Sequence, residues 1–173
     1  MEPMEPTEPT DAGAEPGTRR GATIDWPSVL WGAGVGLVLI VVVATVRVVL
    51  DRNIEDFDES GWVLPLFVLI LGAYLVAGWV AQRRAAAAGR GASPLTHGAL
   101  AGLGAFVLWI PVRIVIWLAR DEERGLLRGS DAALRPGQLF GAIVIAAGVG
   151  MLGGFVAGRV ATRVRARSTT EAS

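Results

Sequence analysis

The chain contains four apolar stretches, each long enough to cross a lipid bilayer as a helix. They occupy residues 28–50, 62–82, 97–119 and 138–158. A bilayer core of ~30 Å requires about 20 helical residues. Within these stretches there is no Asp, Glu or Lys, and the only fixed charges are Arg47 and Arg113. A water-soluble bundle would need a polar stripe on each helix. The sequence therefore predicts an all-α integral membrane protein with four transmembrane helices.

The four stretches align as two copies of one helical hairpin. A shift of 66 residues places Gly32, Gly36 and Arg47 on Gly98, Gly102 and Arg113. A shift of 80 residues places the second-helix segment 76–83 on 156–163, and the larger shift reflects a longer second loop. Because two spans preserve orientation, we expect a tandem parallel repeat of two hairpins, related by a pseudo-twofold axis along the membrane normal.

Three regions follow from composition. Residues 1–25 are acidic and rich in proline, with little to bury, so we expect a disordered tail. Residues 26–158 form the four-span membrane domain, and residues 159–173 form a basic C-terminal tail.

The arginines near the span ends predict the orientation of the chain. Nine lie on the side of the two termini and five on the opposite side. Basic residues favour the cytoplasmic side, so both termini are expected there. All sixteen basic residues are arginine, which indicates GC-rich coding DNA. We therefore expect a multi-pass protein of a bacterial cytoplasmic (inner) membrane.

Small residues spaced four apart predict where the helices pack. In lipid, helices associate through close backbone approach at such positions. We expect these contacts inside one chain, with a seam between copies along the fourth helix as the alternative. The predicted packing positions are Gly32, Gly36, Gly98, Gly102, Gly150, Gly154 and Gly158.

The two intramembrane arginines are the strongest candidates for a site. Each follows its glycine, Gly36 or Gly102, by eleven residues. Because eleven residues are about three helical turns, each arginine lies within ~20° of its glycine face. Both guanidinium groups are therefore predicted to point into the bundle. A charge inside a membrane requires a partner and suggests function.

Three neighbours complete the candidate charge site. Asp51 lies one turn after Arg47, and Trp117 lies one turn after Arg113 as a cation–π candidate. Pro111, two residues before Arg113, would kink the third helix. Three interpretations stay open: arginines that snorkel toward acidic loops or lipid phosphates, an anion or lipid-headgroup site between the repeats, and a gate.

Several classes of function are disfavoured. The chain has no cysteine and a formal net charge of zero, so thiolate chemistry is excluded and a nucleic-acid partner is not expected. No catalytic triad, metal-ligand cluster or phosphate loop is present, and we expect no enzyme activity, cofactor or metal. His97, the single histidine, is predicted to be an interfacial polar residue.

The expected function is that of a structural or accessory component of a membrane complex. Its partners would be the lipid bilayer and either a membrane protein or further copies of the chain. The alternative is a small oligomeric transporter or channel with an anion or lipid-headgroup site near Arg47 and Arg113. In outline the pattern resembles small four-span bacterial membrane proteins, and no motif carries a function over from them.

Overall fold

A computed structural model describes residues 24–89, 93–119 and 135–170. These ranges contain four long helices and one short 3-10 helix. They are α1 (Trp26–Asn53), η1 (Phe57–Glu59), α2 (Val63–Ala87), α3 (Pro94–Ala119) and α4 (Pro136–Thr170). The structure confirms an all-helical fold with four helices long and apolar enough to cross a membrane. The predicted disordered tail lies almost wholly outside the described residues.

Local sequence explains the helix ends. Proline stands in the first turn of α1, where its missing N–H leaves no bond unmade. The alanine run after residue 82 continues α2 to Ala87, and Gly89 then adopts a φ of 67°, the left-handed conformation that ends many helices. The boundary predicted at residue 158 is not a helix end, because α4 continues as one helix to Thr170.

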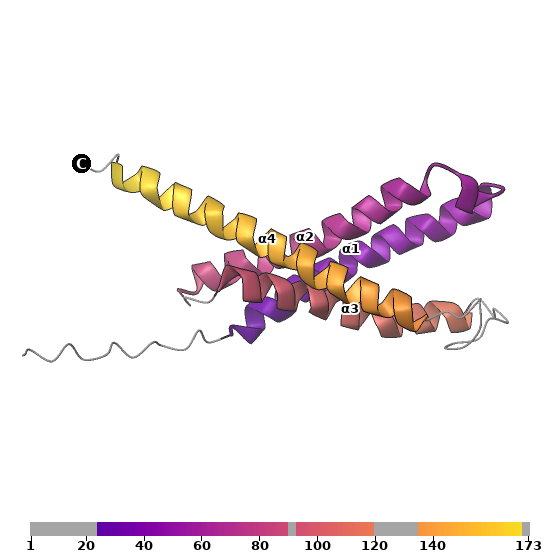
Figure 1. Cartoon of the computed structure of the whole chain (residues 1–173), viewed down its shortest axis with the longest axis horizontal. Helices are drawn as coiled ribbons and strands as arrows, with labels where there is room; N and C mark the ends of the chain where they lie inside the picture. The colour runs from indigo at the N-terminus through magenta and orange to yellow at the C-terminus, as the bar shows by residue number, and fades with distance from the viewer. Residues whose placement is uncertain (1–23, 90–92, 120–134, 171–173) are drawn as a thin grey trace, which may run out of the picture.

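The helices form two hairpins that cross and then diverge (Figure 1). Helix α1 packs on α2 and α3, α4 packs on α3 and α2, and α2 also contacts α3. In the described part of the chain, α1 and α4 share no packed interface. We call the end where α1 begins the Asp25 end and the opposite end the η1 end. The hairpins separate toward the η1 end, on the right of Figure 1.

Two groups of buried side chains hold this arrangement. The larger lies where the helices cross and consists mostly of alanines, with few bulky members; it comprises Ile40, Ala73, Tyr74, Ala77, Ala81, Ala101, Ala105, Phe106 and Ala146. The smaller joins Val43, Phe57 and Leu66 within the first hairpin. Because Phe57 belongs to η1, the loop of that hairpin is anchored on its own helices. The shared core therefore lies at the crossing and not at the η1 end.

Glycine allows three helices to meet at one point. A Cβ added to Gly78 of α2 or to Gly98 of α3 would collide with the carbonyl oxygen of Gly150 in α4. In the first hairpin, a Cβ at Gly32 would meet Ala77 and Ala81 of α2. These backbones approach so closely that no side chain fits between them.

The remaining predicted packing glycines also lie in helix contacts. A Cβ at Gly36 would stand 2.8 Å from the Ala77 methyl and 2.9 Å from the Ala105 methyl. Gly102 lies against Ala146, and both Gly154 and Gly158 lie against Pro94. The predicted packing glycines of α4, Gly150, Gly154 and Gly158, are therefore occupied by contacts within the chain.

The two hairpins do not pack in the same register. Gly32 contacts Ala77 and Ala81, which a shift of 80 would map onto residues 157 and 161. Gly98 instead contacts Gly150 and Gly154, seven residues earlier in α4. Glycine facing glycine permits the closest backbone approach, so the second hairpin adopts the register that matches its glycines. Helices α2 and α3 pack while α1 and α4 do not, which also departs from the predicted pseudo-twofold symmetry.

Candidate functional site

Arg47 and Arg113 lie within electrostatic range of each other although they belong to different hairpins. Arg47 is on α1 and Arg113 on α3, and the two guanidinium groups are near enough for their positive charges to repel. Both lie on the η1 side of the contact between Gly36 and Ala105. The tertiary fold thus brings together the two arginines that the sequence singled out.

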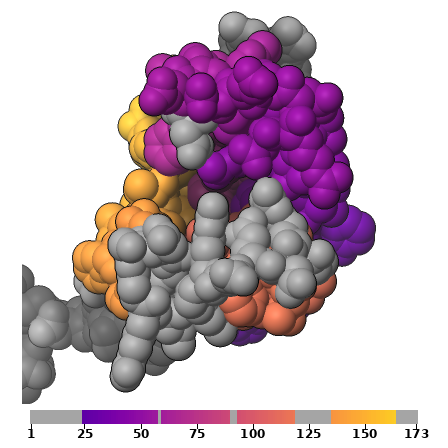
Figure 2. All heavy atoms as spheres, turned by 90° about the vertical axis from the view of Figure 1, so that its right-hand side faces the viewer, coloured from indigo at the N-terminus to yellow at the C-terminus, as the bar shows by residue number. Residues whose placement is uncertain are grey.

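The splay of the hairpins keeps this pair accessible. Both arginine side chains are exposed in the isolated molecule. Nearer the crossing, the same faces of α1 and α3 are buried at Gly36 and Gly102. Figure 2 looks onto the η1 end and shows the two hairpins as separate lobes with a hollow between them. The face that is packed at the crossing is therefore open at the level of the arginines.

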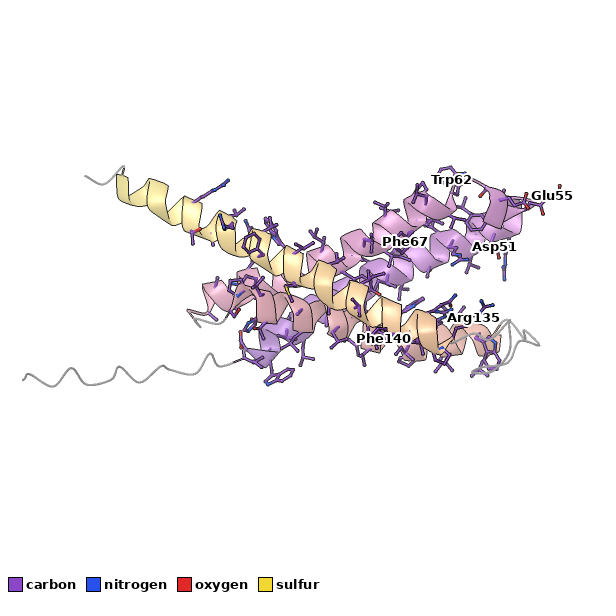
Figure 3. The ribbon with its side chains drawn as sticks, in the orientation of Figure 1. Asp51, Glu55, Trp62, Phe67, Arg135 and Phe140 are labelled. Atoms are coloured by element: carbon purple, nitrogen blue, oxygen red, sulfur yellow. The ribbon has the colours of Figure 1, made fainter. Side chains whose placement is uncertain are left out.

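The surroundings of the pair carry both signs of charge. Asp51 follows Arg47 by one turn of α1, and Arg135 stands at the start of α4; both occupy the η1 end, one on each hairpin (Figure 3). Arg47 and Asp51 each take part in interactions. Exposed acidic side chains at this end also include Glu55, Asp56 and Glu59.

The other two members of the predicted site behave differently. Pro111 lies inside α3, which continues through it without a break. Trp117 does not stack on Arg113, since the cation–π pairs of the described residues are Arg83 with Trp79, Arg84 with Trp31 and Arg159 with Phe155. Instead, the indole N–H of Trp117 is buried without an acceptor.

Two guanidinium groups within electrostatic range of each other are suited to attract an anion. Each presents a planar array of N–H donors that can bind a phosphate or carboxylate through two parallel hydrogen bonds. An anion between Arg47 and Arg113 would also offset the repulsion of their charges. The arrangement is therefore suited to receiving a negatively charged group.

No protein family model, curated protein or solved structure matches this chain. Its function has to be inferred from its own residues.

Sequence reasoning missed a second group of polar residues, at the Asp25 end. The side chain of His97, for which an interfacial position was predicted, is completely buried within the bundle. Its Nε2 accepts a 2.9 Å hydrogen bond from the backbone N–H of Asp25, and its Nδ1 lies 3.3 Å from the carbonyl oxygen of Ser93. This pattern requires a neutral ring with the proton on Nδ1. The Ser28 hydroxyl in turn donates to the Asp25 carboxylate.

Gln82 belongs to the same end of the bundle. It lies one turn from Gly78 in the direction of the Asp25 end, and its neighbour Ala81 contacts Gly32. Gln82 is buried, and its Oε1 has no hydrogen-bond donor. Together with Asp25, Ser28 and His97, it makes up the buried polar residues of the described chain.

One signal could have revealed this group. Asp25 is followed by proline in the first turn of a helix, a combination typical of a helix start. That pattern places Asp25 in the folded domain and not at the end of a tail. The pairing of Asp25 with His97, 72 positions apart, depends on the packing of α1 against α3.

Proposed function

We propose that this chain is a small multi-pass membrane protein that receives an anionic group between its two hairpins. Its four helices would cross the bilayer as two related hairpins, with both termini on the cytoplasmic side. The observation that carries the anion site is the proximity of Arg47 and Arg113, contributed by helices of different hairpins. The candidate anions are a lipid headgroup and a small free anion.

Physical chemistry supports this role for the pair. Two like charges at the edge of an apolar medium repel each other more strongly than in water. A charged side chain within a membrane segment is retained where it has a partner or a task. Asp51 offers one negative charge beside Arg47, and a second negative group between the hairpins would complete the neutralisation.

Ligand-dependent stability of the full-length protein tests the site. The protein would be placed in nanodiscs of phosphatidylcholine, and its melting temperature followed with increasing sulfate or inorganic phosphate, or with increasing phosphatidylglycerol in the disc. A free ligand concentration of 100 times Kd stabilises the folded state by ~2.7 kcal/mol. We expect Arg47→Gln combined with Arg113→Gln to abolish this stabilisation, and Arg52→Gln to retain it.

The two arms of this experiment identify the source of the anion. Stabilisation by sulfate or phosphate in phosphatidylcholine discs indicates a free anion, and stabilisation by phosphatidylglycerol alone indicates a headgroup. Equal stabilisation of the wild type and the doubly substituted variant by every anion would refute the site. Flux assays in liposomes then separate transport from binding.

An accessory role in a membrane complex is a second candidate, supported by the length of α4. This helix continues to Thr170, and its C-terminal part extends away from the other helices (Figure 1). Such an arm could contact a partner protein without disturbing the bundle. Crosslinking of the full-length chain in its native membrane, compared with a chain ending at residue 163, tests this role. A crosslinked product that forms equally well without residues 164–173, or no crosslinked product at all, would count against it.

A further inference from the structure

The described residues of the Asp25 end present positive charge to their surroundings. The exposed charged side chains described at this end all belong to arginines, namely Arg83, Arg84, Arg159 and Arg163. Asp25, the acidic residue described there, is only 4% exposed. The η1 end differs, because both arginines and carboxylates are exposed among its described residues.

Three of these arginines stand over aromatic rings. The guanidinium carbon of Arg84 lies 4.6 Å from the centre of the Trp31 ring, which links α2 to α1. Arg83 lies 5.0 Å from the Trp79 ring one turn earlier on α2. On α4, Arg159 lies 4.9 Å from the Phe155 ring, again one turn earlier. We call Arg83, Arg84 and Arg159 the stacked arginines.

Each ring fixes the depth and orientation of its arginine. Trp31 is 57% exposed and Phe155 is 41% exposed on the outer surface of the bundle, where aromatic side chains favour the membrane–water boundary. A guanidinium over such a ring has one face covered, while the N–H groups along its edge stay free to donate. The N–H donors are therefore held near the depth of lipid headgroups. Because stacking already restricts the arginine side chain, binding a phosphate costs less conformational entropy.

We propose that the stacked arginines form a binding site for the phosphate groups of anionic phospholipids in the leaflet at the Asp25 end. The proposal rests on the membrane location proposed above and is independent of Arg47 and Arg113. A phosphate oxygen accepts hydrogen bonds from guanidinium edges in a bidentate geometry. The exposed charges of the described residues at this end are of one sign, which favours an anionic lipid over a zwitterionic one.

The position of the rings favours a lipid over a soluble anion. The indole of Trp31 and the ring of Phe155 are continuous with the exposed apolar surfaces of α1 and α4, where Leu30 and Leu152 are also exposed. Acyl chains can cover those surfaces while the headgroup reaches the arginines above them. A free phosphate gains only the polar half of this interaction.

Lipid selection in mixed bilayers provides the test. Full-length protein would be extracted with a membrane-solubilising polymer from liposomes of equal phosphatidylglycerol and phosphatidylcholine, and the retained lipids measured by mass spectrometry. Each basic residue near an anionic surface contributes about 1 kcal/mol, which corresponds to about a fivefold change in binding. We expect each single substitution to lower phosphatidylglycerol enrichment by up to about fivefold; the three are Arg83→Gln, Arg84→Gln and Arg159→Gln. The triple variant should abolish the enrichment.

Matched variants separate the stacked arginines from charge in general. Arg52→Gln combined with Arg135→Gln removes two exposed charges at the η1 end and should leave the enrichment unchanged. Trp31→Leu combined with Phe155→Leu keeps every charge and should weaken the enrichment by loss of the stacked geometry. This ring variant also tests the proposal if the triple arginine variant does not fold.

Three outcomes would overturn the inference. They are undiminished enrichment in the triple variant, an equal loss in the η1-end control, and displacement of the retained lipid by millimolar inorganic phosphate. Release of the wild-type chain from membranes by alkaline carbonate would instead contradict the membrane location itself. Failure at Arg47 and Arg113 leaves this site unaffected, because the two sets of residues lie at opposite ends of the molecule.

Discussion

The backbone N–H of Asp25 donates a 2.9 Å hydrogen bond to Nε2 of His97, at the Asp25 end of the bundle. This contact joins the start of α1 to the start of α3. Further along, the same two helices meet where a Cβ on Gly104 would lie 3.0 Å from the Ala33 methyl. These contacts hold α1 against α3 at the Asp25 end. The hairpins diverge at the opposite end, which carries Arg47 and Arg113.

Removing the His97 ring should destabilise the fold. In His97→Ala the N–H of Asp25 would remain buried without an acceptor, which costs about 1–3 kcal/mol. We expect a lower melting temperature, measured by circular dichroism in detergent. Ser28→Ala should have a smaller effect, because Asp25 keeps its backbone bond to the ring. If His97→Ala melts at the wild-type temperature, the bond does not contribute measurably to stability.

Gln82 is expected to respond in the opposite direction. Its Oε1 is buried without a donor, and replacing an unpaired polar group by an apolar one of similar shape is neutral or favourable. Gln82→Leu should therefore raise the free energy of unfolding slightly or leave it unchanged. A loss above about 1 kcal/mol would indicate that Oε1 has a partner, such as a buried water molecule.

The three-helix contact at Gly150 predicts a sharp difference among glycines. Gly150→Ala should disrupt the packing, because the added methyl group would collide with the backbone of α3 at Gly98 and Gly102. Overpacking of this kind costs about 1–3 kcal/mol or more. Gly148→Ala is the control, since a Cβ there meets open space. Thermal unfolding of the two variants side by side gives the measurement, and equal stabilities would contradict the observed register.

The charges of Arg47 and Arg113 should be visible in stability without any ligand. Because the two guanidinium groups repel, Arg113→Gln should raise the melting temperature at low ionic strength. The gain should stay below about 1 kcal/mol, because both side chains are exposed and screened. At ~0.1 M salt the Debye length falls to about 10 Å and the difference should shrink. A variant that melts lower than the wild type at every salt concentration would show that Arg113 has a stabilising partner.

Topology reporters test the proposed orientation. A fluorescent protein fused to either terminus should be bright, and an alkaline phosphatase inserted at Gly61 in the α1–α2 loop should be active. Both results follow from placing the arginine-rich Asp25 end in the cytoplasm. An active phosphatase at either terminus would reverse the orientation or indicate insertion in both directions.

Sequence alone located most of the helical fold. The four apolar stretches predicted the helices because length and apolar composition are read directly from residues 28–50, 62–82, 97–119 and 138–158. The far end of α2 agrees with the alanine run that continues the helix to Ala87, before Gly89. Less accurate was the far end of α4, which continues past the apolar limit to Thr170. Alanine and arginine are strong helix formers, so this helix does not end where the apolar residues do.

The candidate sites divide in the same way. The sequence singled out Arg47 and Arg113, because a charged residue within an apolar stretch is conspicuous without any structure. Their proximity, and the burial of His97 against Asp25, follow from how α1 packs on α3. No local pattern encodes a contact between residues 72 positions apart.

The number and kind of helices follow from the amino-acid sequence, since hydrophobicity and length are properties of single segments. The register of α3 on α4, the divergence of the hairpins at the η1 end and the exposure of the two arginines follow from how the helices pack. The reason is that each of these depends on which glycines meet. Gly98 can pack equally closely against any glycine of a neighbouring helix. Its contact with Gly150 is selected only when the whole bundle packs.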